Sequence, residues 1–164
     1  MYKRQLIRHG QSEWNQQKRF TGWVDVGLTD KGRAEAKKAG ELIKEKKIKL
    51  DSFYSSYQKR ANDTLKIVMK ELNEDENLIT KKWQLNERHY GELTGLNKED
   101  MKKKYGEEKI HQFRRSWDVK PGALDRKSPY HPLNIETYKD IPMSDIPDTE
   151  SLNCLLYTSD AADD

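Results

Sequence analysis

The sequence predicts an α/β fold with a mostly parallel sheet. Three short segments of strand character, at residues 2–7, 50–56 and 78–85, are separated by longer segments whose apolar residues recur at helical spacing. Strands that alternate with helices are typical of a parallel sheet, because each helix carries the chain back along the sheet. The length of 164 residues fits one ordinary domain. We therefore expect a single core.

The first expected strand, residues 2–7, ends in an apolar pair and breaks at Gly10. Its start is more polar than is usual for a buried strand. Residues at the carboxyl ends of parallel strands commonly build active sites in α/β folds. The loop that begins at Arg8 is therefore the first candidate for a functional site.

Two amphipathic helices are expected around the second strand. The first runs from Thr29 or Asp30, either of which could be its N-cap, to about Lys47, and its apolar side chains share one face: Ala36, Ala39 and Ile43. The second begins near Lys59 and ends before the polar run 73–77, with its apolar residues again on one face: Ala61, Leu65, Val68, Met69 and Leu72. Helices of this kind cover a sheet.

The second half of the chain is less regular. Two short helices are expected over residues 98–105 and 107–117. All five prolines lie between residues 120 and 147, where the apolar residues lose their periodicity. Long irregular segments inside compact domains commonly cover a functional site, so we expect residues 120–147 to form a lid-like segment.

The composition argues against several classes of protein. No apolar run approaches the roughly 18 residues of a membrane-spanning helix, and the apolar stretch after residues 1–5 is too short for a signal peptide. A single cysteine, Cys154, provides neither a disulfide framework nor a cysteine-rich zinc site, and no spacing of His, Asp and Glu suggests another metal site. The net charge of +3 is too small to indicate a nucleic-acid partner. We expect a cytoplasmic protein that needs no metal.

The tripeptide Arg8-His9-Gly10 places an imidazole beside a guanidinium. A neutral imidazole can attack phosphorus near pH 7, and Arg8 offers two parallel donors to phosphoryl oxygens. Gly10 would let the backbone approach a ligand closely. A lone histidine is more often a structural hydrogen-bonding group. The tripeptide alone therefore does not establish that His9 is a nucleophile.

Other motifs accompany this tripeptide in the order of a known family. They are Gln11-Ser12-Glu13-Trp14-Asn15, Arg19-Phe20-Thr21-Gly22-Trp23, Asn86-Glu87-Arg88-His89-Tyr90-Gly91, Gly95-Leu96-Asn97-Lys98 and Arg114-Arg115. In these residues the sequence resembles the histidine phosphatase superfamily and, within it, the cofactor-dependent phosphoglycerate mutases. The resemblance runs from about Ile7 to Leu152. It implies a three-layer α/β sandwich with a mostly parallel sheet, incomplete at the carboxyl end.

The resemblance also implies a reaction. His9 would take a phosphoryl group from 2,3-bisphosphoglycerate and pass it to a monophosphoglycerate, which interconverts 2- and 3-phosphoglycerate in glycolysis and gluconeogenesis. Arg8 and Arg60 would grip the phosphoryl group, and Glu87 would act as acid and base, held protonated by burial among aromatic residues such as Tyr90.

Further residues would contact the small phosphorylated substrate. The loop after His9 and the two later motifs supply most of them, and the carboxylate and second phosphate would be held by Tyr90, Lys98, Arg114 and Arg115. The remaining expected contacts are Gly10, Gln11, Ser12, Glu13, Trp14, Asn15, Thr21, Gly22, Arg88 and His89.

The sequence departs from the family in three places. Family members continue into a second His-Gly-Asn motif, which this chain lacks, so we expect at most trace activity from these residues alone. Residues 154–164 do not match: one possible coding of them resembles a transposase adapter used for sequencing libraries, and their composition predicts no helix. We expect a non-native tail there, following a mutase domain over residues 1–153. Gln58 stands before Lys59-Arg60 where a more apolar residue is expected, without disturbing Arg60.

Two other functions stay open. The chain could belong to a phosphatase of the same superfamily, which hands the phosphoryl group to water, or be a non-catalytic fragment that only binds phosphorylated ligands. Whether the full-length enzyme is a homo-oligomer also stays open. Among the other histidines, His89 could serve only to orient its loop, and we expect His111 and His131 on the surface.

Overall fold

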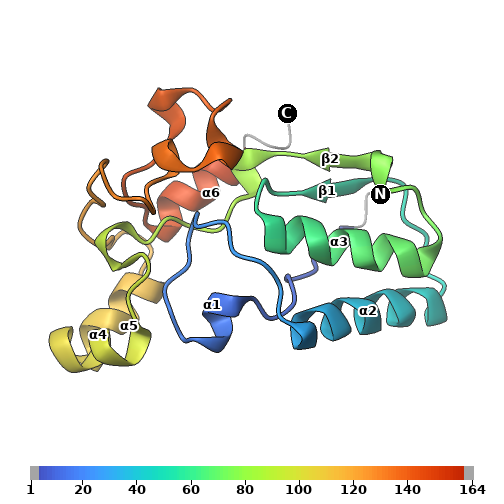
Figure 1. The fold of residues 1–164 in the computed structure, drawn as a ribbon, viewed down its shortest axis with the longest axis horizontal. Helices are drawn as coiled ribbons and strands as arrows, with labels where there is room; N and C mark the ends of the chain where they lie inside the picture. Colours follow the sequence, from blue (N-terminus) through green and yellow to red (C-terminus); the bar gives the residue numbers. More distant parts are fainter. Residues whose placement is uncertain (1–3, 161–164) are drawn as a thin grey trace.

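The computed structural model describes residues 4–160 and shows a short parallel sheet beside two long helices (Figure 1). The strands β1 (Phe53–Ser55) and β2 (Ile79–Lys81) pair in parallel, with Phe53 opposite Ile79. The helix α3 (Lys59–Leu72) lies beside the strands, and α2 (Asp30–Glu45) lies beyond α3. Parallel strands joined through a helix confirm the predicted α/β class.

The ends of α2 and α3 are set by local chemistry. The side chain of Thr29 accepts a hydrogen bond from the backbone N–H of Gly32, which satisfies one of the free donors in the first turn of α2. α3 ends at Asn73, whose left-handed backbone (φ 59°) lets its N–H bond back to the last turn. Gly40 brings the two helices together, because a Cβ there would lie 2.8 Å from the Cβ of Glu71. Both predicted helices are confirmed.

The sheet is smaller than the sequence predicts. Residues 4–7 of the expected first strand form no ladder, and Tyr2 and Lys3 lie outside the described residues. Leu6 is 94% exposed and Ile7 is 43% exposed, so these apolar side chains are not buried against a neighbouring strand of the described residues. On β1, Phe53 is buried whereas Tyr54, on the opposite face, is 57% exposed. The described residues thus form two of the three layers of the expected sandwich, namely the sheet and one layer of helices.

The third expected strand is also cut short. The N–H of Lys82 still donates to the carbonyl of Ser55, but residues Trp83–Leu85 then form a 3-10 turn, η2. The ring of Trp83 lies 6.1 Å from that of Trp23. Packing of this indole against another part of the chain, rather than further strand pairing, directs the backbone from Trp83 onward.

The helices α4 (Lys98–Tyr105) and α5 (Glu107–Arg115) lie at the opposite end of the molecule from α2 and α3 (Figure 1). They share an apolar core with the preceding loops, formed by Phe20, Leu93, Ile110 and Phe113. α5 ends two residues earlier than expected, and Trp117 beyond it is 54% exposed. The short helix α1 (Glu13–Gln16) lies between the two ends of the molecule.

The segment between α5 and the last helix runs irregularly and contains three 3-10 turns: η4 (Pro132–Asn134), η5 (Glu136–Tyr138) and η6 (Met143–Asp145). Its apolar side chains pack on Trp23, and the cluster includes Tyr138, Ile141 and Ile146. The phenol of Tyr138 donates a 2.6 Å hydrogen bond to the carbonyl of Trp23. The segment is therefore packed against the loop that follows α1. A lid function for residues 120–147 stays a prediction.

The last helix, α6 (Leu152–Asp160), corrects the expectation that the tail forms no helix. The hydroxyl of Ser151 accepts a hydrogen bond from the N–H of Cys154, as an N-cap does, and the N–H of Asn153 donates to the carbonyl of Trp117. Capping and one tertiary bond thus start a helix that composition does not favour. Within the described residues, no helix has the length and apolarity needed to cross a bilayer.

Candidate active site

The imidazole of His9 is held in one orientation and one tautomer. Its Nδ1 lies 2.7 Å from the carbonyl oxygen of Gly10, which can only accept, so Nδ1 carries the proton. Nε2 therefore has the lone pair, and it accepts a 3.3 Å hydrogen bond from Nε of Arg60. Burial lowers the pKa of His9, and the cations of Arg60 and Arg8 add to this, against the opposing Gly10 hydrogen bond and Glu87 charge. The ring is thus neutral, with its lone pair on Nε2.

The loop that carries His9 is pressed against the first turn of α2. A Cβ on Gly10 would lie 2.1 Å from the carbonyl oxygen of Gly32, and a Cβ on Gly32 would lie 2.1 Å from that of Gln11. The N–H of Gly10 donates to the hydroxyl of Thr64 on α3. Gly10 is therefore required by close helix packing. The expectation that Gly10 also lets a ligand approach the backbone closely stays a prediction.

Arg60 extends from the first turn of α3 and is fully buried. Its Nη1 donates to the carbonyl of Val24 at 3.0 Å, and its Nη2 donates to the carbonyl of Gly22 at 2.8 Å. Gly22 has a left-handed backbone (φ 56°), which favours glycine at this position. These carbonyls compensate the buried guanidinium and fix its plane.

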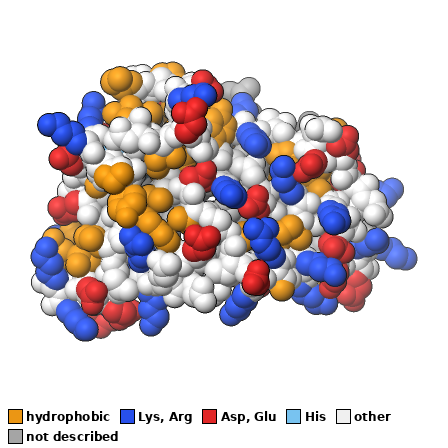
Figure 2. All heavy atoms as spheres, in the orientation of Figure 1, with side chains coloured by type: hydrophobic (Ala, Val, Ile, Leu, Met, Phe, Trp, Pro, Cys, Tyr) orange, Lys and Arg blue, Asp and Glu red, His pale blue; other side chains and the backbone are white. Residues whose placement is uncertain are grey.

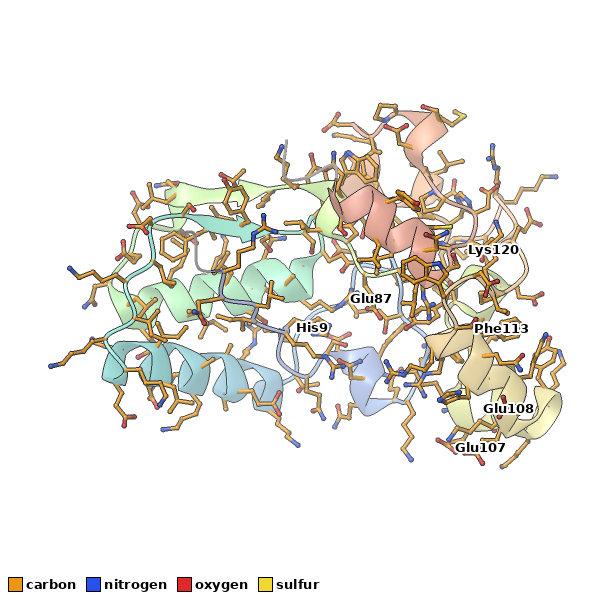
Figure 3. All side chains as sticks on the ribbon, turned by 180° about the vertical axis from the view of Figure 1, so that it is seen from behind. His9, Glu87, Glu107, Glu108, Phe113 and Lys120 are labelled. Carbon is orange, nitrogen blue, oxygen red and sulfur yellow. The ribbon has the colours of Figure 1, made fainter. Side chains whose placement is uncertain are left out.

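Glu87 meets the same guanidinium. Its Oε2 accepts a 2.7 Å hydrogen bond from Nη2 of Arg60, and its side chain is 35% exposed. Figure 3 shows His9 and Glu87 close together in the middle of the molecule. The expected burial of Glu87 among aromatic side chains is wrong, because the nearest group is a cation and about a third of the side chain is open to solvent. Its position beside His9 agrees with the expected site.

A residue that the sequence analysis did not assign to the site lies at its centre. Gln58 is 2% exposed, and its Oε1 accepts hydrogen bonds from Nη2 of Arg60 and from the backbone N–H of Glu87. Its Nε2 donates to the carbonyl of Gly22 at 3.0 Å. The available signal was the amide itself, which stands at a position where an apolar residue was expected.

Several cations gather on the open side of the site. Burial lowers the pKa of Lys98, the neighbouring Arg114 and Arg8 lower it further, and Glu87 opposes them. Burial also raises the pKa of Tyr90, as does the charge of Glu87. Each of these five expected site residues is therefore within electrostatic reach of at least one other. Arg115, which follows Arg114 in the sequence, is exposed on α5.

The residues that follow His9 mainly shape its loop. The hydroxyl of Ser12 accepts from the N–H of Asn15, whose side chain accepts from the N–H of Ser12, so the two form a capping box on α1. Trp14 is buried, with its ring edge-on to Tyr130 at 5.3 Å. Glu13 is exposed.

Thr21 and Gln11 differ in how their polar atoms are satisfied. The hydroxyl of Thr21 is buried and has no hydrogen-bond partner among the described residues. The side-chain oxygen of Gln11 accepts from the hydroxyl of Thr29, and its backbone N–H donates to Glu35. Thr21 is thus one of three expected site residues, with Arg88 and His89, that have a buried polar side-chain atom without a partner among the described residues.

Arg88 and His89 support the loop of Glu87 from behind. Arg88 is buried and donates a 2.9 Å hydrogen bond to the carbonyl of Phe113 at the end of α5. His89 is fully buried, and its Nδ1 accepts from the N–H of Gly91. A substrate contact through either side chain stays a prediction, whereas their structural bonds are in place.

His131 corrects a second expectation, because it is fully buried rather than on the surface. Its Nε2 lies 2.9 Å from a carboxylate oxygen of Asp148, and its Nδ1 accepts from the N–H of Leu133. A buried imidazole is tolerated here because both nitrogens have partners. His111 is exposed, as expected.

The described part of the chain contains no group of three or more His, Cys, Asp and Glu residues that could hold a metal ion. On the face shown in Figure 2, basic and acidic side chains are interspersed over α2 and α3.

Comparisons with known proteins identify the family of the chain. Residues 5–131 match the family described as "Histidine phosphatase superfamily (branch 1)". The chain is 67% identical over 147 residues to the 2,3-bisphosphoglycerate-dependent phosphoglycerate mutase of Pelagibacter ubique (strain HTCC1062), covering 90% of this chain and 61% of the relative. It is 50% identical over 152 residues to the protein of the same name from Borreliella burgdorferi (strain ZS7), covering 93% of this chain and 61% of that one. The chain thus spans about three fifths of the length of these relatives.

Solved structures show the same fold. The structure of Bacillus stearothermophilus YhfR superposes with a TM-score of 0.63 at 23% identity, covering 94% of this chain and 62% of that chain. The phosphoglycerate mutase from Thermus thermophilus superposes with a TM-score of 0.51 at 25% identity, covering 71% of this chain and 60% of that chain.

Proposed function

The chain belongs to branch 1 of the histidine phosphatase superfamily, and we propose that its site is that of a 2,3-bisphosphoglycerate-dependent phosphoglycerate mutase. Such an enzyme interconverts 2-phosphoglycerate and 3-phosphoglycerate through a phosphohistidine. One observation carries the proposal: Nε2 of His9 and the carboxylate of Glu87 contact the same guanidinium, that of Arg60. A nucleophile and an acid–base group are thereby fixed around one phosphoryl-binding cation. The names of the relatives support this reading.

The residues have complementary roles in the proposed transfer. Nε2 of His9 attacks phosphorus, so that an N–P bond forms while the P–O bond of the donor breaks, and Glu87 gives its proton to the departing oxygen. In the return step the hydroxyl of the acceptor attacks phosphorus, the N–P bond breaks, and Glu87 takes the proton back. Arg60 and Arg8 stabilise the negative charge on the phosphoryl oxygens throughout.

The cations on the open side fit a ligand that bears a second phosphate and a carboxylate. Burial lowers the pKa of Lys98, and repulsion from the cations of Arg114 and Arg8 lowers it further. An anion placed among them relieves that repulsion. Thr21 adds a buried hydroxyl without a partner among the described residues. When bound, 2,3-bisphosphoglycerate supplies the phosphoryl group that is transferred to His9. Lys98 and Arg114 would hold the monophosphoglycerate that remains.

The proposal concerns a protein of the relatives' full length. We expect this chain alone to show at most trace mutase activity and residues 154–164 to have no function. A cytoplasmic location and small phosphoglycerates as substrates belong to the same proposal, supported by the names of the relatives.

The test uses a completed chain, in which this sequence up to Leu152 is continued by the carboxyl-terminal remainder of the Pelagibacter ubique relative. It should convert 3-phosphoglycerate to 2-phosphoglycerate only when 2,3-bisphosphoglycerate is added. Lys98→Ala and Arg114→Ala should each reduce this turnover while leaving hydrolysis of a simple phosphomonoester unchanged. If both variants retain full turnover, Lys98 and Arg114 do not hold the substrate and the proposal loses that support. If the completed chain only releases phosphate, the protein is a phosphatase and the mutase assignment is wrong.

A further inference from the structure

Gln58 is buried where three parts of the site meet: the first turn of α3, the loop of Gly22 and the loop of Glu87. It is the N-cap residue of α3, but its side chain does not cap the helix. A carboxylate oxygen of Asp25 accepts the hydrogen bond from the N–H of Lys59 instead, at 2.6 Å. The amide of Gln58 is therefore free for bonds within the site.

The three contacts of the Gln58 side chain agree on one orientation of its amide. Oε1 faces two donors, Nη2 of Arg60 at 3.0 Å and the N–H of Glu87 at 3.2 Å, while Nε2 faces the carbonyl of Gly22. The flipped amide would set N–H groups against N–H groups at the first two contacts. The network thus fixes which end of the amide points to Arg60.

Nη2 of Arg60 is surrounded by more hydrogen-bond acceptors than it has hydrogens to donate. It bears two N–H bonds, yet three oxygens lie around it, those of Gly22 at 2.8 Å, Gln58 at 3.0 Å and Glu87 at 2.7 Å. The acceptors of Gly22 and Gln58 are buried, whereas the side chain of Glu87 is 35% exposed. The Glu87 carboxylate is therefore the one acceptor that can leave.

We propose that Gln58 is a positioning residue that makes the Glu87 carboxylate available to the reacting oxygen. It competes with that carboxylate for the hydrogens of Arg60, and it holds the backbone of Glu87 so that the carboxylate can turn away while its loop stays in place. Gln58 touches neither substrate nor the reacting atoms. The inference rests on the proposed function, because it assigns Glu87 the proton transfer of that reaction.

The kinetic test compares Gln58→Leu and Gln58→Met with a matched control in the completed chain. The control is Asn62→Leu, because Asn62 is also a buried amide on α3, and its Nδ2 donates only to the backbone carbonyls of Ser56 and Gln58. We expect the Gln58 variants to lower kcat about tenfold with little change in KM, since about one hydrogen bond of transition-state positioning is lost. Asn62→Leu should lower the melting temperature without this loss of kcat.

A second measurement does not depend on turnover. Hydrogen exchange of the Glu87 backbone amide, followed by NMR, should accelerate severalfold in Gln58→Leu or Gln58→Met and stay unchanged in Asn62→Leu. Unchanged exchange, or a loss of kcat shared equally by the control, would overturn the role of Gln58. A parent chain that never phosphorylates His9 would overturn the proposed function instead, so the two failures are distinguishable.

Discussion

Nε of Arg60 donates a 3.3 Å hydrogen bond to Nε2 of His9, and Nη2 of the same guanidinium donates to Glu87. One buried side chain therefore sets the distance between the expected nucleophile and the expected acid–base group. The guanidinium also donates to the backbone carbonyls of Val24 and Gly22 and to Oε1 of Gln58, so its position is determined by the fold.

Replacing Arg60 by Lys should damage both activity and stability. An ammonium presents no fork, so it cannot bond His9, Glu87 and the carbonyls of Gly22 and Val24 together. In the completed chain we expect kcat/KM for 3-phosphoglycerate to fall at least about a hundredfold, and the free energy of unfolding to drop by about 1–3 kcal/mol because buried carbonyls lose their donors. A variant with nearly normal kcat/KM would show that Arg60 does not organise the site.

Gly10→Ala should destabilise the fold. The new Cβ would meet the backbone of Gly32 at 2.1 Å, and backbone atoms cannot move aside as a flexible side chain can. We expect a loss of about 3 kcal/mol or more in urea unfolding. Gly27→Ala is the control, because the atom nearest to its Cβ is the side-chain Oε1 of Glu13, at 3.3 Å. Equal stability of the two variants would contradict the packing described for Gly10.

Asp25 should stabilise α3 from outside the helix. Its carboxylate accepts from the N–H of Lys59 and, at 2.7 Å, from the hydroxyl of Thr137. Asp25→Ala should lower the free energy of unfolding by about 1–2 kcal/mol, as the loss of an N-cap does, and Thr137→Val by less. Asp75→Ala, which removes a cap from η1 (Glu76–Leu78) at the far end of α3, is the comparison for an ordinary cap. Chemical denaturation measures all three, and no loss in Asp25→Ala would refute the capping role.

The buried ring of His89 should make stability depend on pH. Burial, together with the neighbouring His131, lowers the pKa of His89 from 6.5 to about 4, against the charge of Asp148. In the unfolded chain His89 becomes protonated below about pH 6.5, whereas in the folded chain it stays neutral down to about pH 4. The free energy of unfolding therefore decreases as the pH falls from 6.5 to 4, by at most about 3 kcal/mol. Glu150, whose pKa is raised by burial, acts in the opposite direction.

A His89→Asn variant isolates this contribution. Its free energy of unfolding should fall less between pH 6.5 and pH 4 than that of the parent, with the window taken from the pKa shift of His89. Denaturation curves across this range measure the difference. Parallel pH dependence in parent and variant would show that His89 is not the titrating group.

The helices were the most predictable part of the fold because their signals are local. Thr29, the apolar spacing along α2 and the polar run after α3 all act within a few residues. Strands need a partner elsewhere in the chain, and the segment that ends in Leu6 and Ile7 finds none in the described residues. His131 was misplaced for a similar reason, since its burial depends on Asp148.

The site was predictable where a motif carried it and not where a long-range contact did. His9, Arg60 and Glu87 come together as the resemblance implies. Gln58 bonds to Gly22, 36 residues before it, and to Glu87, 29 residues after it. Nothing in the sequence around Gln58 indicates these long-range hydrogen bonds. A polar residue at an expected apolar position was the only sign.

The central claim is that His9 accepts a phosphoryl group, and intact-protein mass spectrometry tests it most directly. After brief incubation of the completed chain with 2,3-bisphosphoglycerate, we predict one acid-labile, base-stable phosphate on His9, absent from His9→Asn. An unmodified His9, or a phosphate that persists in His9→Asn, would contradict the account.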